Sequence, residues 1–336
     1  MDDSITISQK IVLLEVTNHC NLNCLFCRAE ANKHLENELK FSEITELLKD
    51  LKDLGAKHIS ITGGEPLMRK DLKDIVHMII SMGFESSIST NGTLISSTDI
   101  EWLEKLKLVR ISLDSADPAK HDAIRGGKKG AFYKTLTNVK LLLENKINVA
   151  IRFTLIPQNI NELPQIIELV RDLGIHSLSL SRGIPIFGGK KFEMLSPKEY
   201  ADTLRHSIEL GQRYGIEISS EDPVTFYILK KDLVSSNTDG LFGGCAAGIS
   251  YIHINSRGNV FPCPYLPIKI GSVKEEKIGD LLKNQKVTEK FYNIRFNLDG
   301  KCKSCKYLNV CGGCRASALS FTDNIQGSDP VCLLGL

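Results

Sequence analysis

"IVLLEVTNHCNLNCLFC", residues 11–27, joins a short apolar run to three closely spaced cysteines. The apolar part, residues 11–16, has the length and composition of a strand buried in a parallel sheet. Cys20, Cys24 and Cys27 follow it with the spacing C-x3-C-x2-C. Three thiolates leave one position open on a centre that takes four ligands, which is typical of a reactive site. The stretch therefore predicts a reactive metal or cluster site at the end of a first strand.

The length and the charge of the chain limit the classes of protein to which it can belong. At 336 residues the chain is long enough for more than one domain. Because 42 Lys and Arg stand against 40 Asp and Glu, we expect no nucleic-acid partner. No apolar run reaches the length of a membrane span, and the N-terminus lacks the apolar core of a signal peptide. These features predict a cytoplasmic protein with no membrane partner.

The ten cysteines fall into two groups, which indicates ligation of inorganic centres. Three lie within residues 20–27 and none lies between 28 and 244. The second group comprises Cys245, Cys263, Cys302, Cys305, Cys311, Cys314 and Cys332. A reducing compartment does not favour structural disulfides. The scattered histidines, among them His253, lack metal-ligand spacing and are expected on helix faces or in loops.

Strand-like and helix-like patterns alternate through the first 180 residues. We expect strands at 11–16, 58–62, 84–90, 108–114, 147–154 and 176–181. Helices are expected between them at 44–54, 71–82, 99–106, 132–145 and 161–174. Six β–α units in series predict an α/β protein with a parallel sheet, either doubly wound or closed into an incomplete barrel.

The composition changes after the sixth unit, which predicts three parts. Residues 1–185 would form the α/β domain, and residues 186–240 a connector with a loop at 184–191 and a helix at 196–215. Residues 241–336 are rich in Gly, Pro and Cys, so we expect a small domain that depends on bound centres for its shape.

Polar groups follow each expected strand, and strand ends of one sense meet at one face of a parallel sheet. The cysteines follow the first strand, and TGGEP (62–66) follows the second. The later segments are STNGT (89–93), SLDS (112–115), Arg152 and Arg182. Because glycine has no side chain, Gly63 and Gly64 would let a ligand approach the backbone beside Glu65.

The cysteine spacing after strand one, together with GGEP after strand two, resembles the radical S-adenosylmethionine (radical SAM) superfamily over residues 10–185. The resemblance implies a partial (β/α)6 TIM-like barrel. It also implies a [4Fe-4S] cluster on Cys20, Cys24 and Cys27, with S-adenosylmethionine on the open iron. Reductive cleavage would give a 5′-deoxyadenosyl radical that takes a hydrogen atom from the substrate. A zinc or structural site completed by His19, or plain buried thiols, are the alternatives.

The resemblance also implies residues that bind S-adenosylmethionine. They are Phe26 at the adenine, Gly63, Gly64 and Glu65 at the methionyl amine, Thr90, Ser112 and Asp114 at the ribose or methionyl end, and Arg152 at the carboxylate. Each has a structural alternative: Phe26 in the core, Ser112 and Asp114 as helix caps, and Arg152 in an ion pair. Many relatives have His-Cys-Tyr around the third cysteine, whereas this chain has Phe-Cys-Arg.

The cysteine-rich tail resembles the SPASM extension of radical SAM maturases over about residues 240–336. By that resemblance Cys245, Cys263 and Cys314 would hold a nearer auxiliary [4Fe-4S] cluster with a fourth site that is not cysteine. Cys302, Cys305, Cys311 and Cys332 would hold an outer one. CGGC (311–314) has two residues between its cysteines where three are usual, so the partition stays open. One cluster, or zinc, are the other possibilities.

Two substrate classes fit these motifs, and the atom that loses hydrogen is not specified. SPASM tails are typical of enzymes that mature ribosomal peptides or proteins, which is the main hypothesis. CGGCRASAL (311–319) and the loop at 184–191 resemble tetrapyrrole-modifying relatives that remove propionate or acetate arms. No peptide-recognition module precedes the first motif, which counts modestly against a large leader-peptide system. We expect a flavodoxin- or ferredoxin-type electron donor in both cases. The hypothesis from a different class is a non-enzymatic iron–sulfur carrier.

Overall fold

The computed structural model describes residues 11–33, 36–185, 192–229, 244–248, 251–283, 297–308, 311–334 and 336. The chain divides into two compact units. The first comprises Met1–Ile111, Tyr133–Val149 and Ala247–Tyr292, and the second comprises Ser112–Phe132, Ala150–Ala246 and Asn293–Leu336.

The first unit is built on a mainly parallel sheet. Strands β1 (Ile11–Glu15), β2 (His58–Thr62), β3 (Glu85–Thr90) and β4 (Leu108–Ser112) pair in chain order, all parallel. On the other edge of β1, strand β8 (Tyr251–Ile254) pairs parallel to it. Strands β9 (Asn259–Phe261) and β10 (Gly271–Ser272) continue the sheet antiparallel. Val12, Leu14, Ile59 and Ile61 are fully buried, as expected for strands covered on both faces.

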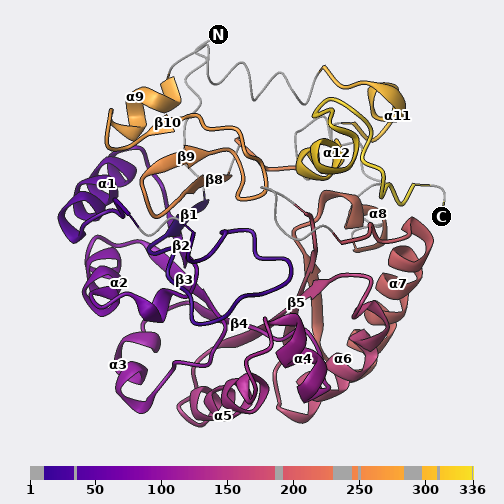
Figure 1. Ribbon diagram of the computed structural model, residues 1–336, viewed down its shortest axis with the longest axis horizontal. Coiled ribbons are helices and arrows are strands. Elements are labelled where there is room, and N and C mark those ends of the chain that lie inside the picture. The colour runs from indigo at the N-terminus through magenta and orange to yellow at the C-terminus, as the bar shows by residue number, and fades with distance from the viewer. Residues whose placement is uncertain are drawn as a thin grey trace. The chain divides into compact units, whose positions relative to one another are not determined.

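Helices follow the strands of this unit in sequence. Figure 1 shows α1 (Phe41–Asp53), α2 (Leu72–Ser81) and α3 (Ile100–Leu103) in succession outside β1, β2 and β3. The unit also contains most of α5 (Ala131–Glu144), all of α9 (Ile278–Lys283) and the short 3-10 turns Pro66–Met68 and Ser97–Asp99. Apolar residues three and four positions apart make up the buried face of α1, which is the pattern that predicts this helix.

The second unit contains parallel strands β5 (Val149–Leu155), β6 (Ser177–Arg182) and β7 (Glu217–Ser220), paired in that order. Its helices are α4 (Pro118–Ile124), α6 (Leu163–Asp172), α7 (Pro197–Tyr214), α8 (Phe226–Leu229), α11 (Gly300–Lys303) and α12 (Arg315–Thr322). Two 3-10 turns, Ile160–Glu162 and Pro223–Thr225, complete it. Helix α7 ends at Gly215, whose φ of 69° is the left-handed conformation that glycine adopts readily.

The predicted α/β fold class is confirmed. The parallel strands and intervening helices form the arrangement typical of a partial barrel, and a cysteine-rich region follows at the C-terminus. All six predicted strands are present. The sheet also extends beyond them: β7 lies in the predicted connector, and β8 pairs with β1 although it lies in the predicted tail domain. Residues 186–191 and 230–243 of the loop and connector lie outside the described residues, and the domain boundaries stay predictions.

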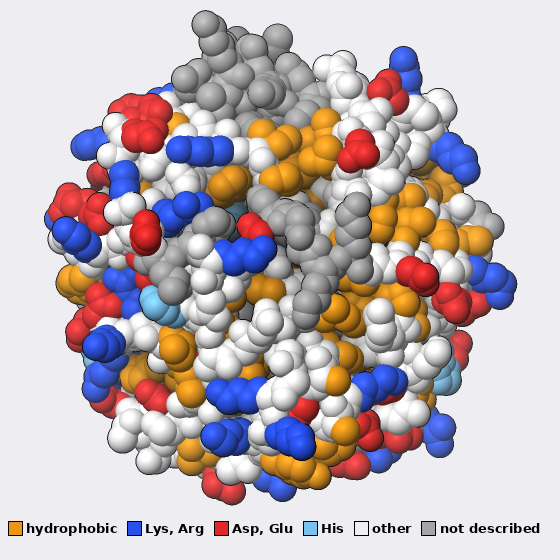
Figure 2. Space-filling view, in the orientation of Figure 1, with side chains coloured by type: hydrophobic (Ala, Val, Ile, Leu, Met, Phe, Trp, Pro, Cys, Tyr) orange, Lys and Arg blue, Asp and Glu red, His pale blue; other side chains and the backbone are white. Residues whose placement is uncertain are grey.

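The surface carries charges of both signs. On the face drawn in Figure 2, basic and acidic side chains are interspersed, in keeping with 42 Lys and Arg against 40 Asp and Glu. Among the helices that the structure describes, none combines the length and the apolar character that a bilayer crossing requires.

Candidate active site and cluster-binding cysteines

The loop that carries Cys20, Cys24 and Cys27 is fixed by side-chain amides. The Asn32 side chain accepts from the Cys20 N–H at 2.9 Å and donates to the Cys20 carbonyl at 2.8 Å. The Asn32 N–H donates to the Asn18 carbonyl at 2.8 Å, and the Asn18 side chain donates to the Ala29 carbonyl at 2.6 Å. Asn32 has a φ of 67°, which asparagine tolerates better than most residues. The two ends of the loop are thus tied together before any metal binds.

Cys20 interacts electrostatically with the other two thiols of this loop. Burial raises the pKa of the Cys20 thiol to about 12 despite the nearby Leu22 N–H, and the charges of Glu65, Cys24 and Cys27 raise it further. The Leu22 N–H points to Cys20 Sγ at 3.4 Å, and the Ala31 N–H points to Cys27 Sγ at 3.5 Å. Soft thiol ligands with N–H groups aimed at sulfur suit an iron–sulfur cluster. Across the described residues, no three His, Cys, Asp or Glu side chains are arranged to hold a single metal ion.

The glycines after β2 are required for a reason that the sequence did not indicate. A Cβ on Gly63 would lie 2.4 Å from the Thr17 carbonyl oxygen, and one on Gly64 would lie 2.4 Å from that of His19. The Gly64 N–H donates to the Thr17 carbonyl at 2.8 Å, and the Glu65 N–H donates to the His19 carbonyl at 2.8 Å. The glycines therefore let the GGE loop pack directly on the backbone of the cysteine loop. Their contact with a methionyl amine stays a prediction.

Glu65 connects the loops after β2 and β3. It is fully buried, and its carboxylate accepts from the Thr90 hydroxyl at 2.7 Å, the Asn91 N–H at 2.8 Å and the Leu67 N–H at 3.2 Å. The Thr90 hydroxyl also accepts from the Gly92 N–H at 3.0 Å. Both side chains thus have partners within the protein, which fix the positions of the two strand ends. Their contacts with S-adenosylmethionine are untested predictions.

Arg28, one of the two residues that depart from the usual family pattern, contacts two strands of the sheet. Its guanidinium donates to Glu15 on β1 at 2.6 Å and to Thr62 on β2 at 3.0 Å. His253 Nε2 on β8 lies 3.1 Å from the same Glu15 carboxylate. The expectation that His253 occupies a helix face or a loop is therefore wrong, because the sheet extends to β8. This buried triad anchors the chain directly after Cys27.

Glu15 gives the triad a measurable pH dependence. Burial alone would raise the pKa of Glu15, but His253 and Arg28 outweigh it and lower the pKa from 4.5 to about 2. A lowered carboxyl pKa contributes stability above the unfolded value that is lost as the pH falls toward the folded one. We expect acidification of the apoprotein from pH 4.5 to 2 to destabilise it by about 3 kcal/mol more than it destabilises a Glu15→Gln variant. Urea unfolding at several pH values tests this expectation. An equal dependence of the unfolding free energy on pH in the two proteins would contradict it.

Three of the predicted cofactor residues lie in the second unit. Ser112 ends β4 and is half-buried. Asp114 is fully buried, forms an ion pair with Arg125 and accepts from the Thr154 N–H at 2.7 Å. Burial raises the pKa of Asp114, and the charges of Arg125 and Arg152 oppose this. Arg152 donates to the Ser181 hydroxyl at 2.9 Å.

Asp114 and Arg152 thus have protein partners, and their roles toward S-adenosylmethionine stay predictions. Phe26, in the first unit, is half-buried, and its adenine contact also stays a prediction.

The second cysteine group is split between the units. Cys263 lies in the first unit, where the Tyr265 N–H points to its sulfur at 3.4 Å. The other six lie in the second unit: Cys245, Cys302, Cys305, Cys311, Cys314 and Cys332. Electrostatic interactions link Cys332 to Cys302, Cys305 and Cys311, and link Cys314 to Cys245. The assignment of these thiols to two clusters stays a prediction.

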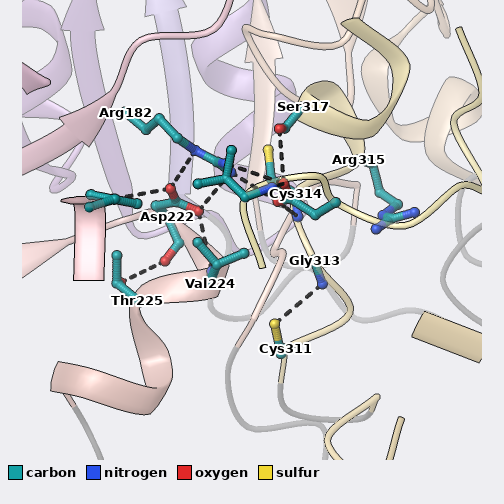
Figure 3. Close-up of polar contacts among 12 residues, drawn as sticks. Arg182, Asp222, Val224, Thr225, Cys311, Gly313, Cys314, Arg315 and Ser317 are labelled. Atoms are coloured by element: carbon teal, nitrogen blue, oxygen red, sulfur yellow. Dashed lines mark hydrogen bonds and ion pairs between the residues drawn. The ribbon is translucent and has the colours of Figure 1, made fainter. Parts of the chain in front are cut away.

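Arg182 at the end of β6 has a different role from the one its position in the sequence suggested. It is 4% exposed, and its Nε lies 2.8 Å from Asp222 while its Nη2 lies 2.9 Å from Asp329. Asp329 also accepts from the Cys314 N–H at 2.9 Å and from the Ser317 hydroxyl at 3.0 Å (Figure 3). Instead of presenting a free polar group at the sheet face, Arg182 connects the sheet to the cysteine loop of the tail.

Sequence reasoning missed the side chains that hold the cysteine loops. Asn32 lies five residues beyond Cys27, and Asp329 lies three residues before Cys332. In a sequence, a single polar residue that holds a loop looks the same as a polar residue exposed to solvent. The roles of Asn32 and Asp329 could therefore not be predicted. Arg28 was noted only as part of the departure from the family pattern, and its contacts were not predicted. The partners of all three are distant in sequence or belong to the backbone.

Comparison with protein families gives two matches. Residues 14–170 match the Radical SAM superfamily, and residues 245–306 match the SPASM iron-sulfur cluster-binding domain. Among solved structures, SuiB of Streptococcus suis bound to S-adenosylmethionine superposes with a TM-score of 0.81 at 21% identity. The match covers 96% of this chain and 77% of SuiB.

Several curated proteins are similar over most of their length. The chain is 29% identical to an AdoMet-dependent heme synthase of Methanosarcina barkeri over 98% of both chains. It is 30% identical to Fe-coproporphyrin III synthase of the same organism, over 96% of this chain and 88% of that protein. It is 27% identical to the subtilosin biosynthesis protein AlbA of Bacillus subtilis, over 91% of this chain and 67% of that protein.

The parallel α/β sheet and the three-thiol loop define an iron–sulfur enzyme that uses S-adenosylmethionine. The chain belongs to the radical SAM superfamily and carries a C-terminal SPASM domain. It is therefore an enzyme, and the hypothesis of a non-enzymatic carrier is dropped.

Proposed function

We propose that this radical SAM enzyme modifies the carboxylate arms of a tetrapyrrole. The observation that carries the proposal is the end-to-end similarity to AdoMet-dependent heme synthases, which leaves almost no part of either chain unmatched. Fe-coproporphyrin III synthase and pre-heme d1 synthase, also similar over most of their length, carry tetrapyrrole names as well. The sequence CGGCRASAL points the same way.

The chain's own residues would bind and orient the cofactors. Cys20, Cys24 and Cys27 would hold the first cluster on a loop that Asn32 closes, and Glu65 would fix the neighbouring strand ends. When bound, the cluster and S-adenosylmethionine supply a radical that removes hydrogen, and auxiliary clusters supply one-electron redox chemistry. The tail would hold two such clusters.

In the proposed reaction on a propionate arm, all atoms and electrons are accounted for. The arm loses one hydrogen atom from the carbon next to the ring and releases its carboxylate as carbon dioxide, which leaves a vinyl group. One electron remains after these steps and has to leave the substrate. An enzyme with redox centres beyond the first cluster is suited to accept it, and seven further cysteines are available for that purpose.

Maturation of a peptide or protein is the second candidate. It is favoured by the similarity to AlbA and by structural similarity to SuiB, whose complex with the precursor peptide SuiA has been solved. The chain spans 67% of AlbA, however, against 98% of the heme synthase. A PqqA peptide cyclase of Granulibacter bethesdensis is matched over 87% of its length but at 25% identity, against 29% for the heme synthase. Identity and coverage together therefore favour the tetrapyrrole hypothesis over the peptide hypothesis, which the sequence alone favoured.

Anaerobic turnover tests the proposal. The reconstituted enzyme is incubated with dithionite, S-adenosylmethionine and Fe-coproporphyrin III, and the products are analysed by mass spectrometry. We expect 5′-deoxyadenosine together with a tetrapyrrole that has lost one carbon dioxide and two hydrogens per modified arm.

A Cys24→Ala variant is the control and should form neither product. Formation of 5′-deoxyadenosine while Fe-coproporphyrin III remains intact would reject the proposed function and favour a peptide substrate.

A further inference from the structure

Arg315, the residue after Cys314, is a buried cation that forms no ion pair with any carboxylate in the described part of the chain. It is 5% exposed and begins α12. Its Nη1 donates to the carbonyl oxygens of Ile325 at 2.9 Å and Gly327 at 2.7 Å. Its Nε is buried and has no hydrogen-bond partner, and none of the described carboxylates forms an ion pair with it. Two carbonyl dipoles are thus its main compensation for burial.

Comparison with Arg182 shows what this site lacks. Arg182 is equally buried in the same unit, but it pairs with the carboxylates of Asp222 and Asp329. Figure 3 shows Arg315 apart from that network, beyond Cys314. A guanidinium removed from water without an anion is strongly unfavourable, because burial removes the solvation of the charge. The described surroundings of Arg315 therefore leave its charge without a paired anion.

The neighbouring sulfur indicates which anion this is. Arg315 Nη2 lies 3.9 Å from Cys302 Sγ, and the backbone between them leaves little room. A Cβ on Gly313 would lie 2.6 Å from Arg315 Nη2, 3.0 Å from Asp329 Cβ and 3.6 Å from Cys302 Sγ. Gly313 has a φ of 63°, so glycine suits this position both in backbone conformation and in space. The guanidinium is thereby held against one particular cysteine.

Cys302, Cys305 and Cys311 each interact electrostatically with Cys332. Four thiols with a buried cation beside them fit a [4Fe-4S] cluster, because the cluster and its four thiolates together carry a net negative charge. Zinc held by four thiolates would also be anionic, but it undergoes no redox change. A redox measurement therefore separates the two centres.

We propose that Arg315 is the counter-ion of the outer auxiliary cluster and raises its reduction potential. Arg315 acts through Cys302 and is a positioning residue. Reduction adds one electron and one negative charge to the cluster, so a nearby cation stabilises the reduced state more than the oxidised one. The inference rests on the predicted ligand set of this cluster and not on the proposed substrate. It concerns how the cluster accepts an electron, whichever molecule provides it.

The test uses the full-length chain with Cys20, Cys24 and Cys27 replaced by alanine, which removes the first cluster and all cleavage of S-adenosylmethionine. Dithionite titration followed by electron paramagnetic resonance then reports only the auxiliary centres. The outer cluster is the signal lost when Cys302→Ala and Cys305→Ala are added. In this background we compare Arg315→Met, Arg315→Lys and the exposed Arg213→Met on α7, which makes the same change in net charge.

We expect Arg315→Met to make reduction of the outer cluster about tenfold less favourable, a fall of about 59 mV for a one-electron couple. Arg315→Lys should retain most of the potential, and Arg213→Met should leave it unchanged. An unchanged potential in Arg315→Met, with its iron content intact, overturns the proposal. The proposal is also overturned if replacement of Cys302 and Cys305 removes neither iron nor a paramagnetic resonance signal.

A stability measurement separates the counter-ion role from a purely structural one. In the apoprotein, Arg315→Met should unfold at nearly the wild-type urea concentration, because loss of two hydrogen bonds is offset by removal of an unpaired buried cation. In the loaded protein the same variant should release iron faster to a chelator, while Arg315→Lys should not. The proposal is rejected if Arg315→Met destabilises the apoprotein and the loaded protein equally, or if both variants lose iron. Either result would show that Arg315 only stabilises the local structure.

Discussion

Replacing Gly64 with alanine is expected to lower S-adenosylmethionine cleavage by about 100-fold, the effect typical of misplacing catalytic groups by about 1 Å. The new Cβ would lie 2.4 Å from the His19 carbonyl oxygen and 2.7 Å from that of Asn18. Both are backbone atoms, so the clash cannot be relieved by rotating a side chain. It displaces the segment directly before Cys20, and it weakens the hydrogen bond from the Glu65 N–H to His19. We also expect a loss of about 1–3 kcal/mol in the free energy of unfolding.

The measurements are iron content, 5′-deoxyadenosine formation and urea unfolding. Gly279→Ala in α9 is a matched control, because its Cβ would meet only the Leu54 side chain, at 3.3 Å. Alanine favours a helix over glycine, so this variant should be as stable as the wild type or slightly more stable. If Gly64→Ala cleaves S-adenosylmethionine at the wild-type rate, the close packing of the two loops is not needed for the site.

Replacing Arg182 with methionine is expected to destabilise the apoprotein by about 3–5 kcal/mol, as is typical when one partner of a buried ion pair is removed. Asp222 and Asp329 would then remain buried without their cation. Burial already raises the pKa of Asp222 despite Arg182, so loss of the guanidinium raises that pKa further. Because Asp329 also holds the Cys314 N–H, we expect less iron to be retained in the tail.

Urea unfolding and iron analysis check this result. Arg205→Met in α7 is the control, because its contacts with Asp202 and with the Leu336 carbonyl are exposed and its ion pair should contribute no more than about 1 kcal/mol. Adding Asp222→Asn to Arg182→Met should recover part of the lost stability, since a neutral amide needs no cation. Destabilisation no larger than that of Arg205→Met would show that the buried network contributes little.

Much of the fold could be predicted from local sequence patterns. Six apolar runs separated by amphipathic helices predict the parallel sheet, because a strand buried on both faces and a helix buried on one face leave different periodicities. The short β8, by contrast, follows a cysteine and glycine-rich segment with no periodicity of its own. It was not predicted, because its pairing with β1 is a contact between residues 240 positions apart along the chain, such as Ile11 and Tyr251.

The sequence by itself determined the class of this protein, because the spacing of Cys20, Cys24 and Cys27 and the GGE segment are typical of the radical SAM superfamily, to which the chain belongs. Only the tertiary structure decided which side chains support that chemistry. It placed Gly64 against the backbone of His19, paired Arg182 with two aspartates and put Arg315 beside Cys302, where none of the described carboxylates forms an ion pair with it. The physical reason is that ligand spacing is local along the chain. Burial and the pairing of charges, in contrast, depend on which distant segments fold together.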